Sequence, residues 1–404
     1  MTAPERPTTS PARWRPISGP WTGRALAVAG VTGMVVATAL AARHAESAAS
    51  QVWSPFVLVA GLLLVGLVAD GDGLFLAAGN RLARLAPNAV ALFAGASVLV
   101  AVVTAVLNLD TSVVFLTPVL VYAARSRGQG EAPLLYACLL LSNAGSLLLP
   151  GSNLTNLIVA GHLHFSGATF FDRMAPSWIC AVVVTATVVG IVERRSLRAG
   201  PGAGALPQSS PAPAPATAQE PVTFGLGLGA VAAVTVFVLV LRAPAIPVAA
   251  VGVVVVAIRL ARHGENPQRV LSVLGLPVLI GLFGVAVTLG ALGRSWSGPA
   301  SALSHLDAWG TGAVAALSSV AVNNLPAASL LASRVPPRPY ALLIGLDVGP
   351  NLFVTGSLAW ILWLAAARGA GAHPSVRRAT LLGVLSVPLS MGAALGVLSL
   401  TGSH

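Results

Sequence analysis

The chain has 404 residues, of which 55% are hydrophobic and 9% charged, and its mean hydropathy is +0.84. Soluble domains carry roughly a quarter charged residues, so this composition excludes a soluble globular protein and indicates an integral membrane protein. The net charge of +11 comes from arginines spread thinly between apolar runs. That spacing argues against a nucleic-acid-binding face and favours determinants of membrane topology.

Twelve apolar segments follow one another along the chain, and a spanning helix needs about 20 such residues. Leucines at helical spacing with arginines between them predict an interfacial amphipathic helix over Leu74–Leu85. The apolar segments lie near residues 25–42, 52–69, 88–107, 111–124, 133–161, 174–192, 224–241, 244–260, 270–292, 308–323, 340–366 and 379–400.

Composition divides the chain into four parts. Residues 1–24 are rich in proline, threonine and arginine and predict a disordered tail, and residues 25–198 form a first transmembrane repeat. Residues 199–223 are rich in proline and alanine and predict a flexible linker. Residues 224–404 form the second repeat.

Arginine placement predicts the orientation in the membrane. If residues 88–124 form a hairpin that enters and leaves on one side, 17 arginines lie on that side and six on the other. Cytoplasmic loops carry such an excess. The sequence therefore predicts a multi-pass protein of the cell membrane with a cytoplasmic N-terminus and linker.

Two apolar segments are interrupted in equivalent places of the two halves. Residues 142–158 and 346–358 both place glycine, proline, asparagine and hydroxyl side chains inside an apolar run, and superposing Gly145 on Gly349 aligns leucines between them. An opened backbone survives in the membrane only in protein or beside a wet cavity. The expected fold is an all-α polytopic membrane protein, an inverted-repeat secondary transporter with two re-entrant hairpins and two discontinuous helices.

The candidate solute and ion site combines the two breaks with the two hairpin tips. For the asparagines, the alternative role is helix capping and bonding between helices. The candidate binding residues are Asn108, Asp110, Thr111, Asn143, Ser146, Asn153, Thr155, Asn323, Asn324, Asp347, Asn351, Thr355 and Ser357.

The two acids are the candidates for proton coupling. A carboxylate at membrane depth costs at least about 2.5 kcal/mol, so it needs a partner, a proton or water. Asp110 and Asp347 are therefore expected to carry protons, the alternative for each being a cap at an interfacial helix end. Trp178, Trp360 and Trp363 are interpreted as interface anchors or packing residues. No catalytic, nucleotide-binding or metal-binding motif is present, so no enzymatic activity, cofactor or metal is expected.

Four runs carry a resemblance to a known family: NLDTSVVFLTPV (108–119), SNAGSLLLPGSNLTNLIV (142–159), NNLP (323–326) and DVGPNLFVTGSLAWILWL (347–364). The chain resembles the arsenite permeases of the ArsB type, the membrane subunits of arsenical pumps. They belong to the ion transporter superfamily with dicarboxylate/sodium symporters and NhaD-type sodium/proton antiporters. The resemblance implies an inner-membrane exporter of arsenite or antimonite, working alone in exchange for protons or with a soluble ATPase subunit.

The chemistry of the breaks agrees with that cargo. Arsenous acid is largely uncharged at neutral pH, and its three hydroxyls donate and accept, so amides and hydroxyls suit it. No arginine lies in either break, which argues against a tightly held multivalent anion. The alternatives are a sodium/proton antiporter, a dicarboxylate-like anion transporter of the same superfamily, and a passive channel or membrane scaffold. The sequence decides neither a homodimeric state nor the need for an ATPase partner.

Overall fold

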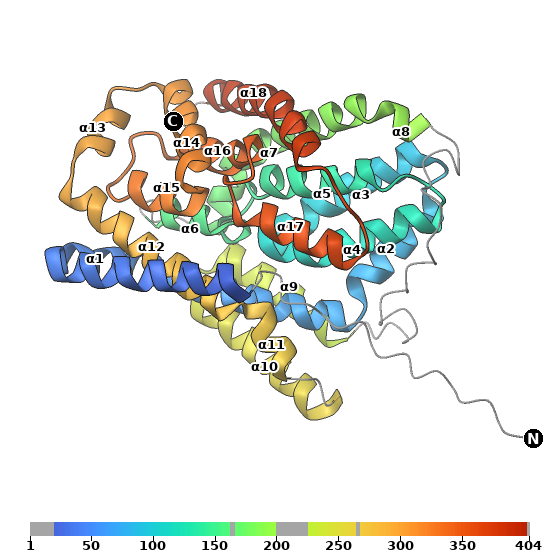
Figure 1. The fold of residues 1–404 in the computed structure, drawn as a ribbon, viewed down its shortest axis with the longest axis horizontal. Helices are drawn as coiled ribbons and strands as arrows, with labels where there is room; N and C mark the ends of the chain where they lie inside the picture. The colour runs from blue at the N-terminus through green and yellow to red at the C-terminus, as the bar shows by residue number, and fades with distance from the viewer. Residues whose placement is uncertain (1–19, 162–165, 199–224, 264–266, 402–404) are drawn as a thin grey trace, which may run out of the picture.

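A computed structural model of the chain describes residues 20–161, 166–198, 225–263 and 267–401. The predicted tail lies mostly outside this range, and the predicted linker 199–223 lies outside it entirely. The described residues form helices and no strands. The elements are α1 (Pro20–Gly71), α2 (Leu74–Leu85), α3 (Ala89–Val106), α4 (Leu109–Ser126), α5 (Ala132–Gly145), η1 (Pro150–Ser152), α6 (Leu154–Ala160), α7 (Gly167–Val192), α8 (Arg194–Arg198), α9 (Leu226–Val240), α10 (Ala245–His263), α11 (Pro267–Leu274), α12 (Leu276–Ser295), α13 (Gly298–Ser304), α14 (Ala308–Val322), α15 (Asn324–Leu331), α16 (Pro339–Val348), η3 (Gly349–Leu352), α17 (Leu358–Gly369) and α18 (Val376–Leu400) (Figure 1).

The first two apolar segments lie within α1, which changes direction at Ala41. This residue leaves helical geometry, with φ −151° and ψ 58°. Before the kink, Gly30 lies against the backbone of Gly281 in α12; after it, Phe56 packs edge-on against Phe283 at 5.4 Å between ring centroids. Both parts of α1, before and after the kink, therefore pack against the same stretch of α12. The first helix of one predicted repeat thus packs on the other repeat.

A helix with the predicted bounds is confirmed, since α2 runs from Leu74 to Leu85, and its place at the membrane interface stays a prediction. Gly73 precedes it with φ 76°, in the left-handed region that glycine adopts without strain. Another glycine, Gly275 with φ 55°, divides the predicted span 270–292 into the short α11 and the long α12.

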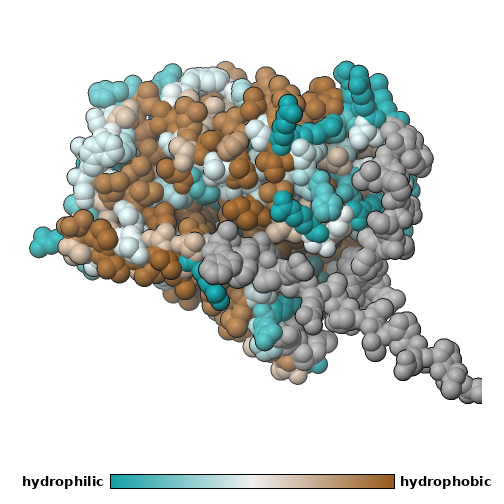
Figure 2. Space-filling model, in the orientation of Figure 1, coloured by the Kyte–Doolittle hydropathy of each residue, from teal (hydrophilic) through white to brown (hydrophobic). Residues whose placement is uncertain are grey.

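The lipid-facing surface is apolar. Among the described helices, six are long and apolar enough to cross a membrane, as the composition predicts. Val183, Val253 and Leu389 are more than half exposed on α7, α10 and α18. Figure 2 shows apolar residues over the middle of one face, with hydrophilic residues gathered toward its ends. The protein is a polytopic all-α membrane protein.

Ion pairs and carbonyl contacts join arginines at one end of the bundle. Arg378 binds both carboxylate oxygens of the buried Glu193, at 2.7 and 2.9 Å. Arg259 pairs with Asp72 and Arg269 with Asp70. The bonding partners lie on helices from both halves of the chain, so this end ties the halves together.

Candidate functional site

The first break separates α5 from α6 and is held open by its own polar side chains. The Pro150–Ser152 turn interrupts the helix, and the Asn153 side chain caps the restart by accepting from the Thr155 N–H at 3.3 Å. Asn156 donates to the carbonyls of Ser146 and Leu149, at 2.7 and 3.1 Å. These bonds replace the helical bonds that a proline and an open turn remove.

The second break separates α16 from α17 by η3 and a turn over residues 353–357. The indole N–H of Trp360 donates to the Pro350 carbonyl at 2.9 Å. At the first break, Trp178 donates in the same way to the Gly145 carbonyl at 3.0 Å. Each interrupted helix thus has a freed carbonyl satisfied by a tryptophan, so the interpretation of these residues as anchors or packing was incomplete.

The breaks meet through their side chains, and Asp347 is the centre of the contact. Its Oδ1 accepts from the Asn153 amide at 2.9 Å and from the Thr155 hydroxyl at 2.7 Å. Asn143 donates to Asn351 Oδ1 at 2.9 Å, across the other side of the breaks. Asn153 is 5% exposed and the other four residues are fully buried. We call Asp347, Asn153, Thr155, Asn143 and Asn351 the central cluster.

Each side-chain donor group of the central cluster already has an acceptor inside the protein. Asn351 donates to the Leu140 carbonyl at 2.9 Å, and the other donors bind one another or Asp347. The unsatisfied atoms are acceptors: Asn143 Oδ1 and Asp347 Oδ2 have no hydrogen-bond partner among the residues that the structure describes. The cluster atoms that lack any partner are therefore acceptor oxygens.

The first hairpin tip lies level with the start of α17. Arg125, near the end of α4, donates to the carbonyls of Ala370 and Gly371, just beyond the end of α17. The two helices pack together, and their ends are joined, so they run parallel. At 1.5 Å per residue, Asp110 lies about 22 Å from the Arg125 end and Ser357 about 20 Å.

Buried polar atoms without partners gather at this level of the described structure. Ser357 is 1% exposed and does not cap α17, although it occupies the cap position. Asn108 caps α4 by accepting from the Thr111 N–H at 2.7 Å. The unpartnered atoms are Asn108 Nδ2, Asp110 Oδ1, Thr111 Oγ1, Ser112 Oγ and Ser357 Oγ.

The second hairpin tip lies over the end of the second break. Asn323 has φ 76°, and among the described residues it alone has a positive φ without being a glycine. Strained backbone of this kind is concentrated at functional sites. Asn323 donates to the Thr355 carbonyl at 3.2 Å, and the Asn324 N–H donates to the Gly356 carbonyl at 2.8 Å.

The four half-helices that begin at the tips and breaks run to opposite ends of the molecule. Arg125 joins the ends of α4 and α17, while Gln51 of α1 donates to the carbonyls of Ile158 in α6 and Ala332 at the end of α15. In Figure 1, α6 and α15 lie toward one side and α4 and α17 toward the other. Their N-termini, which carry partial positive charge, therefore face the interior of the bundle.

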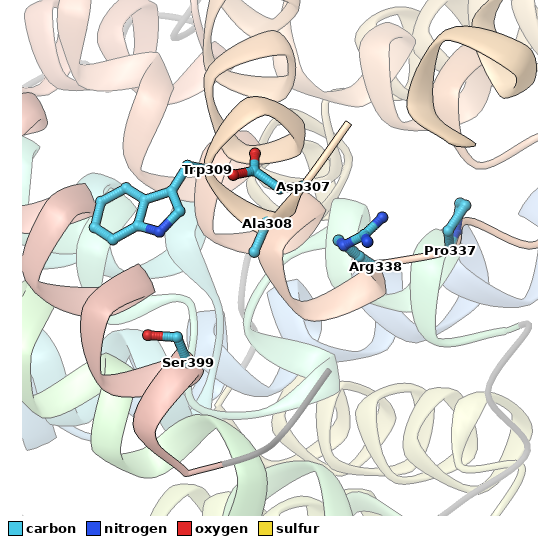
Figure 3. Close-up of a pocket in the computed structure, with 6 residues that line it drawn as sticks. All are labelled: Asp307, Ala308, Trp309, Pro337, Arg338 and Ser399. Atoms are coloured by element: carbon cyan, nitrogen blue, oxygen red, sulfur yellow. The ribbon is translucent and has the colours of Figure 1, made fainter. Parts of the chain in front are cut away.

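A surface cavity of about 460 Å³ lies elsewhere, at the start of α14 (Figure 3). Its charged side chains are engaged: Asp307 accepts from the Gly310 N–H at 2.7 Å, and Arg338 donates to the Leu306 carbonyl at 2.5 Å. Asp307 and the tip residue Asn323 are separated by the length of α14, about 24 Å. This cavity is not part of the site at the breaks.

The family model for citrate transporters (CitMHS) matches residues 17–365. The chain belongs to the citrate transporter family. It is 26% identical over 344 residues to the arsenical pump membrane protein of Escherichia coli and 27% identical to that of Yersinia enterocolitica, with 78% of each chain covered. The resemblance to arsenical pump membrane subunits is thereby confirmed.

A solved structure shares the fold of this citrate transporter family member. The Alcanivorax borkumensis YdaH transporter, whose structure is described as having an unusual topology, aligns with a TM-score of 0.51. The alignment covers 88% of this chain and 87% of the other, at 12% sequence identity. The family model and the two relatives identify the chain as a secondary transporter of the ion transporter superfamily rather than an enzyme.

The predicted residues fall into three groups in this transporter. The central cluster and the adjoining Ser146 are in contact, since Asn153 also donates to Ser146 Oγ at 3.4 Å. Asn108, Asp110 and Thr111 lie at the first tip, level with Ser357. Asn323 and Asn324 bind the second break, but Thr355 is exposed, and its hydroxyl donates to the Val320 carbonyl at 2.6 Å. Whether these groups bind solute stays a prediction.

Sequence reasoning overlooked two kinds of residue. Gln51 bonds to both half-helices that start at the first break and the second tip, but it lies far away in sequence, in the polar stretch just before the apolar segment 52–69. Nothing in that stretch distinguishes it from an ordinary polar residue between two helical segments. Ser112 lies beside the predicted Asp110 and Thr111, and its burial without a partner shows only in three dimensions.

Proposed function

We propose that this chain expels arsenous acid or its antimony analogue across the cell membrane in exchange for protons, by alternating access. The arginine-rich end, with the N-terminus and the linker, would face the cytoplasm. The two halves would act as an inverted repeat about the breaks. The inverted repeat is supported by matching elements that run in opposite directions: α4 runs opposite to α15, and α6 runs opposite to α17.

One observation carries the choice of cargo: the open atoms of the central cluster are acceptors. Asp347 Oδ2 and Asn143 Oδ1 are free, while every donor group in the cluster is engaged. A neutral molecule with three hydroxyls can donate to such oxygens. Citrate carries several carboxylates, which need donors or positive charge, and neither break contains an arginine.

The exchange for protons is supported by the placement of two carboxylates, of which Asp347 is fully buried and Asp110 partly buried. Among the described residues, Asp347 has amide and hydroxyl partners and no basic one, and the free oxygen of Asp110 lies at the tip of the first hairpin. A charged carboxylate without a partner at membrane depth carries a high free-energy cost. A proton taken up by one of them as the solute leaves would remove that cost.

Sodium/proton exchange is the second candidate, because the same acceptor oxygens suit a hard cation. Uptake measurements distinguish the two candidates. They use vesicles that contain the purified protein and have an interior more acidic than the bath. Arsenite, sodium and citrate would be offered in turn. The proposal expects arsenite to accumulate above its bath concentration. Accumulation of citrate or sodium alone would refute it, and mere equilibration of arsenite would indicate a channel.

A further inference from the structure

Gln51 bonds to three elements from a position on α1. Its amide nitrogen donates to the carbonyl of Ile158 at 3.2 Å and to that of Ala332 at 3.0 Å. Its amide oxygen accepts from Arg294 of α12 at 2.5 Å. One partly buried side chain therefore connects α6, α15 and α12.

The two carbonyls belong to the C-terminal ends of short half-helices. A helix leaves its last four carbonyls without intrahelical partners, and in the membrane each needs another donor. α6 has seven residues and α15 has eight, so their ends are a large part of each element. Gln51 supplies one donor to each end and so fixes the two helices relative to each other.

The N-terminal ends of these helices carry the candidate site. Ile158 is one turn from Thr155, whose hydroxyl binds Asp347. Ala332 is about two turns from Asn324, which binds the second break. A shift at the Gln51 end moves these residues as well, because a seven- or eight-residue helix transmits it without an intervening bend.

Arg294 determines which way the Gln51 amide faces. Its guanidinium offers only donors, so the Gln51 oxygen must point to it and both amide hydrogens remain for the carbonyls. Arg294 is itself held, since it also donates to the Gly290 carbonyl at 2.9 Å. A Cβ at Gly290 would lie 3.2 Å from the Arg294 guanidinium nitrogen, so the glycine leaves room for this arrangement.

We propose that Gln51, oriented by Arg294, is a positioning residue that sets the spacing and depth of α6 and α15 and thereby shapes the central cluster. This inference rests on the proposed function in so far as the cluster is the solute site. The contact with α6 and α15 stands independently of the cargo. Arg125 joins the ends of α4 and α17 in a similar way, but it belongs to one of the two helices that it joins.

Hydrogen–deuterium exchange on the full chain in lipid nanodiscs tests the contact without any cargo. Gln51→Met removes all three bonds and preserves length, while Ser50→Ala removes a neighbouring exposed hydroxyl that binds only its own helix. Each of the two helices loses one bond, which corresponds to roughly a fivefold change in its opening equilibrium. We expect exchange in residues 154–160 and 324–331 to rise by roughly that factor in Q51M, with α4 and α17 unchanged.

Exchange in an Arg294 variant and arsenite uptake by Q51M complete the test. Arg294→Met should raise exchange in the same two peptides by a smaller factor, and S50A should match the wild type. In vesicles, Q51M should raise the KM for arsenite and leave the maximal rate near that of the wild type. Wild-type exchange in Q51M, or a uniform rise along the chain, would overturn the contact. Raised exchange with an unchanged KM would overturn the positioning role. Failure of the wild type to transport arsenite would refute the proposed function, while the exchange data would still decide the contact.

Discussion

Replacing Asp347 by asparagine separates the role of its charge from that of its hydrogen bonds. In the wild type, Asn153 and Thr155 donate to Asp347 Oδ1 at 2.9 and 2.7 Å. The asparagine oxygen can keep accepting both bonds, and the new amide takes the place of the unpartnered Oδ2. Bonds to a charged acceptor are worth about 1 kcal/mol more than neutral ones. The two bonds together lose about 2 kcal/mol.

The substitution also removes a buried charge, whose presence at membrane depth costs at least about 2.5 kcal/mol. The two effects nearly cancel, but the new amide takes a place where the described residues offer no partner and so adds about 1–3 kcal/mol. D347N should therefore insert and fold with a modest loss of stability. Asp347→Ala differs, because it leaves the Thr155 hydroxyl without an acceptor and the Asn153 amide with only the long bond to Ser146 Oγ. Each unsatisfied donor costs about 1–3 kcal/mol, so D347A should be clearly destabilised.

The assay is arsenite uptake into vesicles whose interior is more acidic than the bath. The wild type should accumulate arsenite and lose accumulation when the gradient is collapsed by an ionophore. D347N should show no response to the gradient, because the amide cannot bind and release the proton. If D347N accumulated arsenite in proportion to the gradient as the wild type does, Asp347 would not carry the coupled proton.

Three further predictions concern other parts of the site and its supports. Asp110→Asn should abolish gradient-driven uptake but leave membrane insertion intact, and full activity of this variant would remove Asp110 from the mechanism. Trp178→Phe keeps the ring but loses the indole N–H at the first break, so the free energy of unfolding should fall by about 1 kcal/mol, measured by denaturant titration in detergent; an unchanged value would mean that water replaces the indole. Gly345→Ala would place a Cβ 2.2 Å from a backbone carbonyl of α14, so thermal stability should drop sharply, whereas the control Gly229→Ala meets nothing within 4 Å and should behave as the wild type.

The positions of the elements could be predicted because each depends on local sequence. Pro150 with Gly151, and Gly349 with Pro350, interrupt the helices of their apolar runs, and both breaks are found there. Leucines and arginines at helical spacing likewise define α2. The kink at Ala41 was not predicted in place, since alanine favours helix and the change of direction follows from packing against α12.

The pairing of the site residues could not be predicted, because it depends on distant elements. Two polar breaks predict that amides and carboxylates meet, but not that Asn153 chooses Asp347 while Asn143 chooses Asn351. Thr355 shows the limit most clearly. Its type and spacing predict a site residue, but the second tip takes its hydroxyl and carbonyl, and its side chain is exposed.

The close approach of α1 to α12 has a consequence for biogenesis. A Cβ on Gly30 would lie 2.1 Å from the carbonyl oxygen of Gly281, so the two backbones touch without intervening side chains. Because α1 is synthesised well before α12, the face of α1 that meets α12 must remain in lipid, unpacked, until α12 has been inserted. Cutting the gene at the linker would separate these partners, so the two fragments would have to be produced together to yield a folded transporter.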